Sequence, residues 1–324
     1  MAVAATSAPK ESRSIWRALD LLGDWATLLT LEGYWLGARR FSELQTLTGL
    51  PKTVLSSRLK TLVGADLLRR HAYSVRPPRS EYRGTKKLMD LFPAALAMFQ
   101  WEQRWGHKDS KWVITLTHKM CGETMVPLTV CGHCHQDLSA RDCAWTAGPS
   151  ADLIHAGYAR RRRRSDQTPV RSGLLDTCFQ TIGDRWSGLI LHSVFCGINR
   201  YDDLLGATRA ASNILSDRLK WLCQAKILRR LAYQNAPARF AYRLSDRGRE
   251  LYPILVALLT WGNRWYPAAE GPPILLSHRT CGEPLKLAFV CSACRQPLAL
   301  GDIDSQVEAR SVSLARVLPA SAIT

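Results

Sequence analysis

The sequence contains an internal duplication, and this constrains the fold more than any other feature. When the chain is shifted by about 160 positions it falls on itself, and Gly23-Asp24 lies on Gly183-Asp184. The register is kept along each copy, so that His118, Cys121, Cys131 and Cys134 fall on His278, Cys281, Cys291 and Cys294. A repeat this long is enough for each copy to fold around its own core. The function must therefore suit a molecule with two similar halves.

The composition favours a globular protein that binds a polyanion. The 324 residues are 46% hydrophobic, and 44 Lys and Arg against 27 Asp and Glu give a formal charge of +17. Such an excess favours nucleic acid or an acidic membrane surface. The longest apolar run, at 251–261, is shorter than the stretch of about 18 residues needed to span a bilayer. Residues 1–10 lack a signal-peptide pattern, so we expect a cytoplasmic protein.

The pattern of apolar residues predicts mostly helices, and it is clearest in the second copy. One or two helices are expected at 174–196, a short helix at 201–205 and a turn of small residues at 206–211. A further helix is predicted at 212–225, with Ser212 as its N-cap and a buried leucine stripe. In the first copy, Pro51 suits the first turn of the matching helix.

Two short extended runs follow that helix in each copy. In the second copy they lie at 228–233 and 240–244, and a long helix is predicted at 245–265. The first copy repeats the order, with a long helix at 85–105. Helix, turn, helix and basic hairpin are the order of a winged helix-turn-helix. The fold predicted is mainly α with small β wings (α+β), in tandem, with the second helix of each pair entering the major groove of DNA.

The outward faces of the two recognition helices carry short polar and basic side chains that can reach bases or phosphates. Any surface helix shows polar residues, so the prediction depends on the whole arrangement. Arg58 and Arg218, beside the buried stripe, could instead pair with a carboxylate. The predicted DNA-contacting residues are Lys52, Thr53, Ser56, Ser57, Arg58, Lys60, Arg76 and Arg79 in the first copy, and Ser212, Asn213, Ser216, Asp217, Arg218, Lys220 and Arg239 in the second.

A His-x2-Cys-x9-Cys-x2-Cys motif occurs once in each copy. Three thiolates and one imidazole are a common ligand set for structural zinc, and four protein ligands leave no open position for catalysis. We therefore expect a zinc ribbon within each copy, with short strands at 127–130 and 285–290. Inherited buried thiols and redox-sensing thiols are the alternatives. The predicted ligands are His118, Cys121, Cys131 and Cys134, and His278, Cys281, Cys291 and Cys294.

These predictions divide the chain into seven segments. The run of arginines at 160–164 either adds a non-specific phosphate contact or only keeps a linker soluble. The two predicted long helices are rich in tryptophan, so we expect them to lie in the core or at a dimer seam and not to line a ligand pocket. The expected segments are a mobile N-terminus at 1–13, winged helix domains at 14–109 and 173–269, Cys/His ribbons at 110–138 and 270–298, an arginine-rich linker at 139–172 and a flexible tail at 299–324.

The chain resembles the HxlR-type winged helix-turn-helix transcriptional regulators of bacteria. In the second copy the resemblance lies in Ile182–Trp186, Arg200–Leu204, Ile214–Leu222, Tyr242–Ser245 and Gly248–Leu251, and in the first copy in Gly23–Trp25, Arg40–Leu44, Val54–Lys60 and Tyr82–Thr85. It implies base readout by the helices at 51–62 and 212–222. It also implies dimer-like association through the first and last helices, either between two chains or as a pseudo-dimer within one.

The sequence departs from that family in two places. Trp25 stands one position earlier than Trp186, and the position where some members carry an oxidant-sensing cysteine is occupied by Arg13 or Gly173. Cys178 lies elsewhere, so the resemblance does not carry that mechanism to this chain. The two heads also differ, since Asp217 stands where the first copy has Ser57. We therefore expect an operator with two unequal half-sites about one helical turn apart.

The prediction is a non-enzymatic, sequence-specific regulator that binds double-stranded DNA, with an unidentified small-molecule effector as a further partner. The sequence contains no Gly-rich phosphate loop or nucleophile elbow. Two alternatives remain open. One is a sensor whose DNA affinity changes with metal or oxidant. The other is a winged-helix scaffold that binds proteins and contacts DNA without sequence preference.

Overall fold

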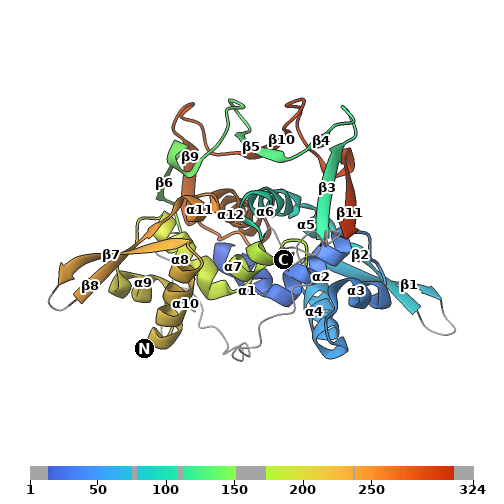
Figure 1. Cartoon of the computed structure of the whole chain (residues 1–324), viewed down its shortest axis with the longest axis horizontal. Coiled ribbons are helices and arrows are strands. Elements are labelled where there is room, and N and C mark those ends of the chain that lie inside the picture. Colours follow the sequence, from blue (N-terminus) through green and yellow to red (C-terminus); the bar gives the residue numbers. More distant parts are fainter. Residues whose placement is uncertain (1–13, 75–78, 108–111, 151–172, 236–237, 310–324) are drawn as a thin grey trace, which may run out of the picture.

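The computed structural model describes residues 14–74, 79–107, 112–150, 173–235 and 238–309. Figure 1 shows the two copies side by side, with their wings at opposite ends of the molecule. The recognition helices project along one edge of the molecule, and the Cys/His strands lie along the opposite edge. The two copies therefore face the same direction, as the two halves of a dimer do.

Both copies form a winged helix-turn-helix, as predicted, with the same order of elements. The first contains α1 (Ser14–Leu22), α2 (Trp25–Trp35), α3 (Phe41–Thr48), α4 (Lys52–Gly64), β1 (Leu68–Ser74), β2 (Arg79–Gly84), α5 (Lys86–Met89) and α6 (Phe92–Trp105). The second contains α7 (Asp176–Ile182), α8 (Arg185–Phe195), α9 (Tyr201–Thr208), α10 (Ser212–Gln224), β7 (Leu228–Asn235), β8 (Ala238–Leu244), α11 (Asp246–Arg249) and α12 (Tyr252–Trp265). The recognition helices are α4 and α10.

Three local predictions are corrected. The single long helix expected in each copy is a one-turn helix followed by a longer one, because Pro93 and Pro253 lack the N–H that a continuous helix needs and therefore occupy the first turn of α6 and α12. The helix α9 continues to Thr208, so the turn is shorter than expected. Ser212 is the first residue of α10; the cap position belongs to Ala211, which makes no side-chain cap bond.

A close approach of the two copies occurs at the repeated Gly-Asp pair. Asp24 and Asp184 form an antiparallel bridge with each other, and each caps the helix that follows it, with Thr27 N and Ser187 N donating to the carboxylates at 2.9 and 3.1 Å. A Cβ at Gly23 would lie 2.8 Å from the Arg185 Cα, and one at Gly183 would lie 3.0 Å from the Trp25 Cα. Glycine is therefore required sterically at both positions.

One hydrophobic core spans both copies. The helix α12 packs on α1 and on α6, and buried residues of both copies belong to a single cluster. Tryptophans bridge the copies: Trp101 Nε1 donates to the Arg247 carbonyl at 3.1 Å, and Trp261 Nε1 donates to the Lys87 carbonyl at 2.8 Å. Both side chains are 2% exposed. Trp101 and Trp261 therefore lie in the core where the two copies meet, as the prediction of a core or dimer seam expected.

The Cys/His segments pair between the copies. Antiparallel pairs join β5 to β10, β3 to β11 and β6 to β9, so each pair takes one strand from the first half of the chain and one from the second. The expectation of a separate ribbon in each copy is therefore wrong. The elements are β3 (Trp112–His118), β4 (Thr124–Met125), β5 (Pro127–Cys131), η1 (Ala140–Asp142), β6 (Cys143–Ala147), β9 (Ile274–His278), β10 (Leu287–Cys291), η2 (Leu300–Asp302) and β11 (Ile303–Ala309).

The same pairing corrects two boundaries. The strand β6 lies at the start of the expected linker, and β11 lies at the start of the expected flexible tail. Each pairs with a strand of the other copy, β6 with β9 and β11 with β3, and the sequence of one copy considered alone does not show this pairing. The arginine run at 160–164 and the remaining tail lie outside the described residues. Among the helices that the structure describes, none has the length and apolarity to cross a bilayer.

Candidate nucleic-acid interface and Cys/His sites

The recognition helices present matching surfaces. In both, the leucine stripe is buried: Leu55, Leu59 and Leu62 in α4 correspond to Leu215, Leu219 and Leu222 in α10. The predicted base-reading positions are exposed in both helices: Lys52, Thr53, Ser56, Ser57 and Lys60, and Ser212, Asn213, Ser216, Asp217 and Lys220. The structure therefore brings these ten predicted residues to two equivalent outer faces.

Arg58 and Arg218 pair with the aspartates of the Gly-Asp pairs. Arg58 Nη2 lies 3.0 Å from Asp24 Oδ1, and Arg218 Nε lies 2.8 Å from Asp184 Oδ2. The arginine side chains are 29% and 31% exposed. Of the two alternatives left open by the sequence, the carboxylate partner is the one found in the structure.

These ion pairs connect the recognition helices to the centre of the molecule. Each aspartate caps α2 or α8, lies where the two copies meet and holds the arginine of α4 or α10. Arg58 also donates two hydrogen bonds to Asp24, whereas Arg218 and Asp184 form an ion pair, and a partly buried charged pair fixes orientation better than an exposed pair does. Sequence reasoning missed Asp24 and Asp184 as site residues, although their equivalent positions in the repeat were visible.

The two heads differ in side-chain contacts. In the second copy, Tyr201 Oη lies 3.0 Å from Ser216 Oγ and donates to the Ser212 carbonyl at 3.0 Å. The first copy has Phe41 at the matching position, which has no hydroxyl, so Ser56 lacks this neighbour. This difference adds to that between Ser57 and Asp217, and the two reading surfaces are chemically unequal.

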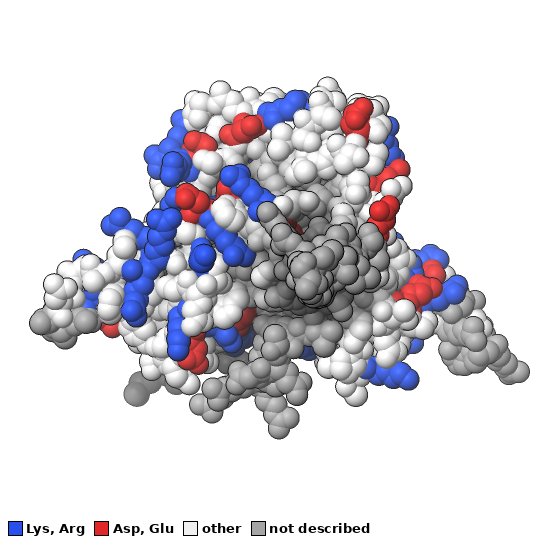
Figure 2. Space-filling view, in the orientation of Figure 1, with Lys and Arg blue, Asp and Glu red and all other residues white. Residues whose placement is uncertain are grey.

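The structure describes two of the three predicted arginines of the wings. Arg239 is exposed on β8, and Arg79 begins β2, whereas Arg76 lies outside the described residues. Lys and Arg are spread over both heads in Figure 2, most densely over the second copy. Arg209, which was not predicted, is exposed in the turn before α10 with φ of 50°, where the first copy has Gly49 with φ of 63°. Alignment of the two copies, which puts Arg209 on Gly49 directly before the recognition helix, could have identified this residue.

The eight predicted ligands gather into two groups, each drawn from both copies. The first Cys/His site contains His118, Cys121, Cys291 and Cys294, and the second contains Cys131, Cys134, His278 and Cys281. The His-x2-Cys half of one copy therefore meets the Cys-x2-Cys half of the other. The expectation that each motif closes within its own copy is wrong, because β5 pairs with β10 and carries each Cys-x2-Cys pair to the opposite copy.

The spacing within each group is that of a four-ligand metal site. His118 Nδ1 lies 3.4 Å from Cys121 Sγ and 3.2 Å from Cys294 Sγ, and the Sγ atoms of Cys121 and Cys291 lie 3.9 Å apart. The second site repeats these values: His278 Nδ1 lies 3.3 Å from the Sγ atoms of both Cys134 and Cys281. Ligand atoms of a tetrahedral zinc site lie roughly 3.5–3.8 Å apart. Both groups could hold a metal ion.

The backbone around the ligands supports the same interpretation. Tight turns at Gly122 and Gly282 follow the His-x2-Cys pairs, with φ of 74° and 75°. His135 and Arg295 follow the Cys-x2-Cys pairs with φ of 59°, a left-handed conformation that is uncommon for residues other than glycine. His118 and Cys131 are fully buried. Three cysteines and one histidine gathered on such turns are a common ligand set of structural zinc.

Two of the cysteines outside the Cys/His sites have thiols of raised pKa. Cys178 is fully buried in α7, and burial raises the pKa of its thiol well above the ordinary value. Cys196 shows the same effect, since burial raises the pKa of its thiol to about 11. Thiols of raised pKa hold little thiolate at neutral pH and react slowly with oxidants. Cys178 and Cys196 therefore do not support an oxidant-sensing mechanism like that of some HxlR-type regulators.

Two winged helix-turn-helix units with exposed recognition helices on a common edge define a DNA-binding transcriptional regulator. The profile of the HxlR-like helix-turn-helix family matches residues 21–110 and 181–270. The chain belongs to this family, which is not a family of enzymes.

Several known proteins are similar to parts of the chain. The uncharacterized HTH-type transcriptional regulator Rv3095 of Mycobacterium tuberculosis is 40% identical over 149 residues, which is 46% of this chain and 94% of that protein. The HTH-type transcriptional regulator YodB of Bacillus subtilis is 27% identical over 92 residues, 28% of this chain and 82% of that protein. A solved structure, PA1374 of Pseudomonas aeruginosa, described as a candidate transcription factor, is 28% identical, covers 44% of this chain and 91% of its own, and has a TM-score of 0.31.

Proposed function

We propose that one chain binds a single double-stranded DNA operator with both heads, α4 in one major groove and α10 in the next. The observation that supports this proposal is that both recognition helices are exposed on the same edge of the molecule. The ion pairs Arg58–Asp24 and Arg218–Asp184 connect them to its centre. A second chain is not needed for two-site binding. The protein acts in the cytoplasm, where the DNA lies, and catalyses no reaction.

The proposed base-reading and phosphate-contacting residues are those exposed on the two helices, with Arg239 and the first-copy wing contacting the backbone. Arg58 and Arg218 position the helices through the aspartates and do not contact DNA themselves. Asp217 can accept from the amino group of cytosine, whereas Ser57 can donate or accept. The operator therefore has two unequal half-sites.

Selection of bound DNA from a random library, followed by affinity measurements against salt, tests this proposal. We expect a two-part motif without palindromic symmetry that is retained at physiological salt. Asp217→Ser gives both heads a serine and Ser57→Asp gives both heads an aspartate, so each variant should shift the selected motif toward symmetry. A perfect palindrome from the unaltered chain would instead indicate a dimer of chains.

We further propose that both Cys/His sites hold structural zinc. Three thiolates and one imidazole suit zinc, and the ligand spacing suits a tetrahedron. Each ion would join the two halves of the chain, so its binding free energy would stabilise the pseudo-dimer. The sites lie on the edge opposite α4 and α10, which favours a structural role over direct contact with DNA.

Elemental analysis after dialysis against a chelator tests both the metal and the pairing. The unaltered chain should retain two zinc ions. Cys121→Ser with Cys291→Ser removes two ligands from one site and should leave one chelator-resistant ion. Cys121→Ser with Cys131→Ser removes one ligand from each site and should leave none. The reverse pattern would show pairing within each copy, and well under one zinc in the unaltered chain would reject the metal.

A further inference from the structure

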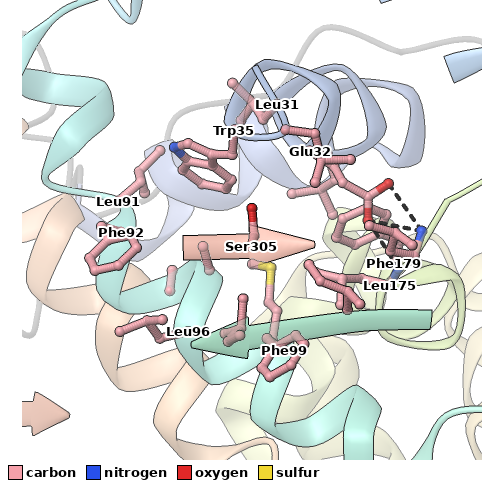
Figure 3. A pocket seen from close by; sticks show the side chains of 18 of the residues that line it. Leu31, Glu32, Trp35, Leu91, Phe92, Leu96, Phe99, Leu175, Phe179 and Ser305 are labelled. Carbon is pink, nitrogen blue, oxygen red and sulfur yellow. Dashed lines mark hydrogen bonds between the residues drawn. The ribbon is translucent and has the colours of Figure 1, made fainter. Parts of the chain in front are cut away.

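A cavity of about 230 Å³ lies beside the first head, between α2, α6 and the strand β11. Figure 3 shows Leu31 and Trp35 of α2, Phe99 of α6, and Phe179 of α7 around it. Well-packed interiors contain few voids larger than a water molecule. An engineered apolar cavity of about 150 Å³ is sufficient to bind benzene. The cavity is therefore large enough for a small molecule.

The matching space in the second copy is largely filled. There the cavity is about 70 Å³ and is lined by residues equivalent in the repeat. Two exchanges place larger side chains in the second lining: Leu255 stands for Ala95, and Trp145 of β6, which is 45% exposed, stands for Ser305 of β11. The equivalence of the two strands follows from their pairing, since Ser305 lies opposite Leu116 and Trp145 lies opposite Leu276. Of these two cavities, the one beside the first head is the larger.

The walls of the cavity define what it can accept. They are mostly aliphatic and aromatic, and none of the described lining residues is Lys, Arg or His. Glu32, which is 7% exposed, is the one acidic lining residue, and its carboxyl accepts from the backbone N–H groups of Leu174 and Leu175 at 3.0 Å. Ser305 is exposed on β11, and its hydroxyl points toward α2 (Figure 3). An anion would meet no compensating charge here.

We propose that this cavity is a binding site for one uncharged, mostly apolar molecule of one or two rings that carries a single N–H or O–H group. The rings would occupy the space that Leu255 and Trp145 take in the second copy. The polar group would face Ser305 or the carboxyl of Glu32. Small-molecule sites are concave and mostly apolar, with few polar groups that fix orientation, and this cavity has that character.

The position of the cavity connects it to DNA binding, a step that rests on the proposed function. Its wall includes α2, which packs on α3 and α4, and the start of α7, which belongs to the other copy. A ligand there would contact both heads at once and bias the angle between them. Binding energy that differs between two head arrangements changes DNA affinity, and DNA changes ligand affinity by the same factor.

Calorimetric titration of the full chain with indole tests the site without DNA. Indole is uncharged and has one N–H donor; indole-3-acetate and tryptamine present the same rings with a negative and a positive charge. We expect one indole per chain and at least tenfold weaker binding of both charged probes. Tighter binding of tryptamine would overturn the assignment to uncharged molecules, and no binding of indole above the millimolar range would overturn the site.

Variants that copy the second half of the chain locate the bound probe. Ala95→Leu and Ser305→Trp introduce the residues that the other copy already carries, and each should weaken indole binding at least tenfold. Gln306→Trp places the same ring at the next position of β11, which does not line the cavity, and should bind within threefold of the unaltered chain. Thermal unfolding confirms that each variant is folded. Unchanged binding in both filling variants would place indole elsewhere and refute the proposal.

The coupling to DNA is measured separately, with the selected operator and saturating indole. We expect operator affinity to change at least threefold in the unaltered chain and not in Ala95→Leu. Indole binding without any change in operator affinity would overturn the coupling alone. Failure to bind any operator would instead count against the proposed function, so the two failures are distinguishable.

Discussion

Replacing Glu32 with glutamine should change how stability depends on pH. Burial raises the pKa of this carboxyl from 4.5 to about 8, and the nearby acids Asp176 and Glu102 act in the same direction, while the N–H groups of Leu174 and Leu175 oppose it. The folded state therefore holds a proton that the unfolded chain releases above 4.5. The carboxyl costs stability as pH rises from 4.5 to 8, and the cost is constant above 8.

The magnitude follows from the two pKa values. One pKa unit corresponds to about 1.36 kcal/mol, so the full difference between about 8 and 4.5 is worth about 5 kcal/mol as an upper figure. About 2.5 kcal/mol of this falls between pH 6 and pH 9, a range in which Cys/His ligation is kept. Glutamine keeps an acceptor for the backbone N–H groups and has no proton to lose. The stability of Glu32→Gln relative to the unaltered chain should therefore increase with pH.

Denaturant unfolding at several pH values between 6 and 9 measures this difference, and common titrations cancel between the two proteins. Glu43→Gln is the control, because Glu43 is a partly exposed carboxyl whose pKa is lowered by hydrogen bonds from the backbone N–H groups of Arg39 and Arg40. Its stability difference should not increase with pH over this range. A Glu32→Gln difference that is the same at pH 6 and pH 9 would refute the reasoning.

Three further predictions concern the DNA-binding surface. Asp24→Asn removes the charged partner of Arg58 and should weaken operator binding roughly tenfold, measured by fluorescence anisotropy; an unchanged affinity would show that the ion pair does not orient α4. Arg209→Gly removes the strain of a left-handed backbone conformation at a position where the first copy has Gly49. It should raise the free energy of unfolding by about 0.5–1 kcal/mol and weaken DNA binding. Equal or lower stability would contradict it. Lys220→Ala should lower the slope of log affinity against log salt by about 1, and an unaltered slope would exclude a phosphate contact.

Much of the fold followed from the sequence because local signals there agree with the tertiary structure. The repeat, the leucine stripes at Leu55–Leu62 and Leu215–Leu222, and the extended runs after them predicted two winged helix-turn-helix units. The exposed positions of the recognition helices followed from helical periodicity alone. The eight candidate metal ligands were also visible, because each motif is short and occurs twice.

The sequence by itself determined that there are two similar heads and which residues face outward from them. Only the tertiary structure decided which residues meet: Cys121 with Cys291, Arg58 with Asp24, and Ala95 with Ser305 in the lining of a cavity that is smaller in the second copy. The spacing of apolar residues predicts which side chains of a helix or strand face the core, but not which other element they contact. Because the two copies are nearly equivalent, a strand can pair with its own copy or with the other through the same contacts. The choice depends on how the shared core and the connections place the strands, which no local pattern encodes.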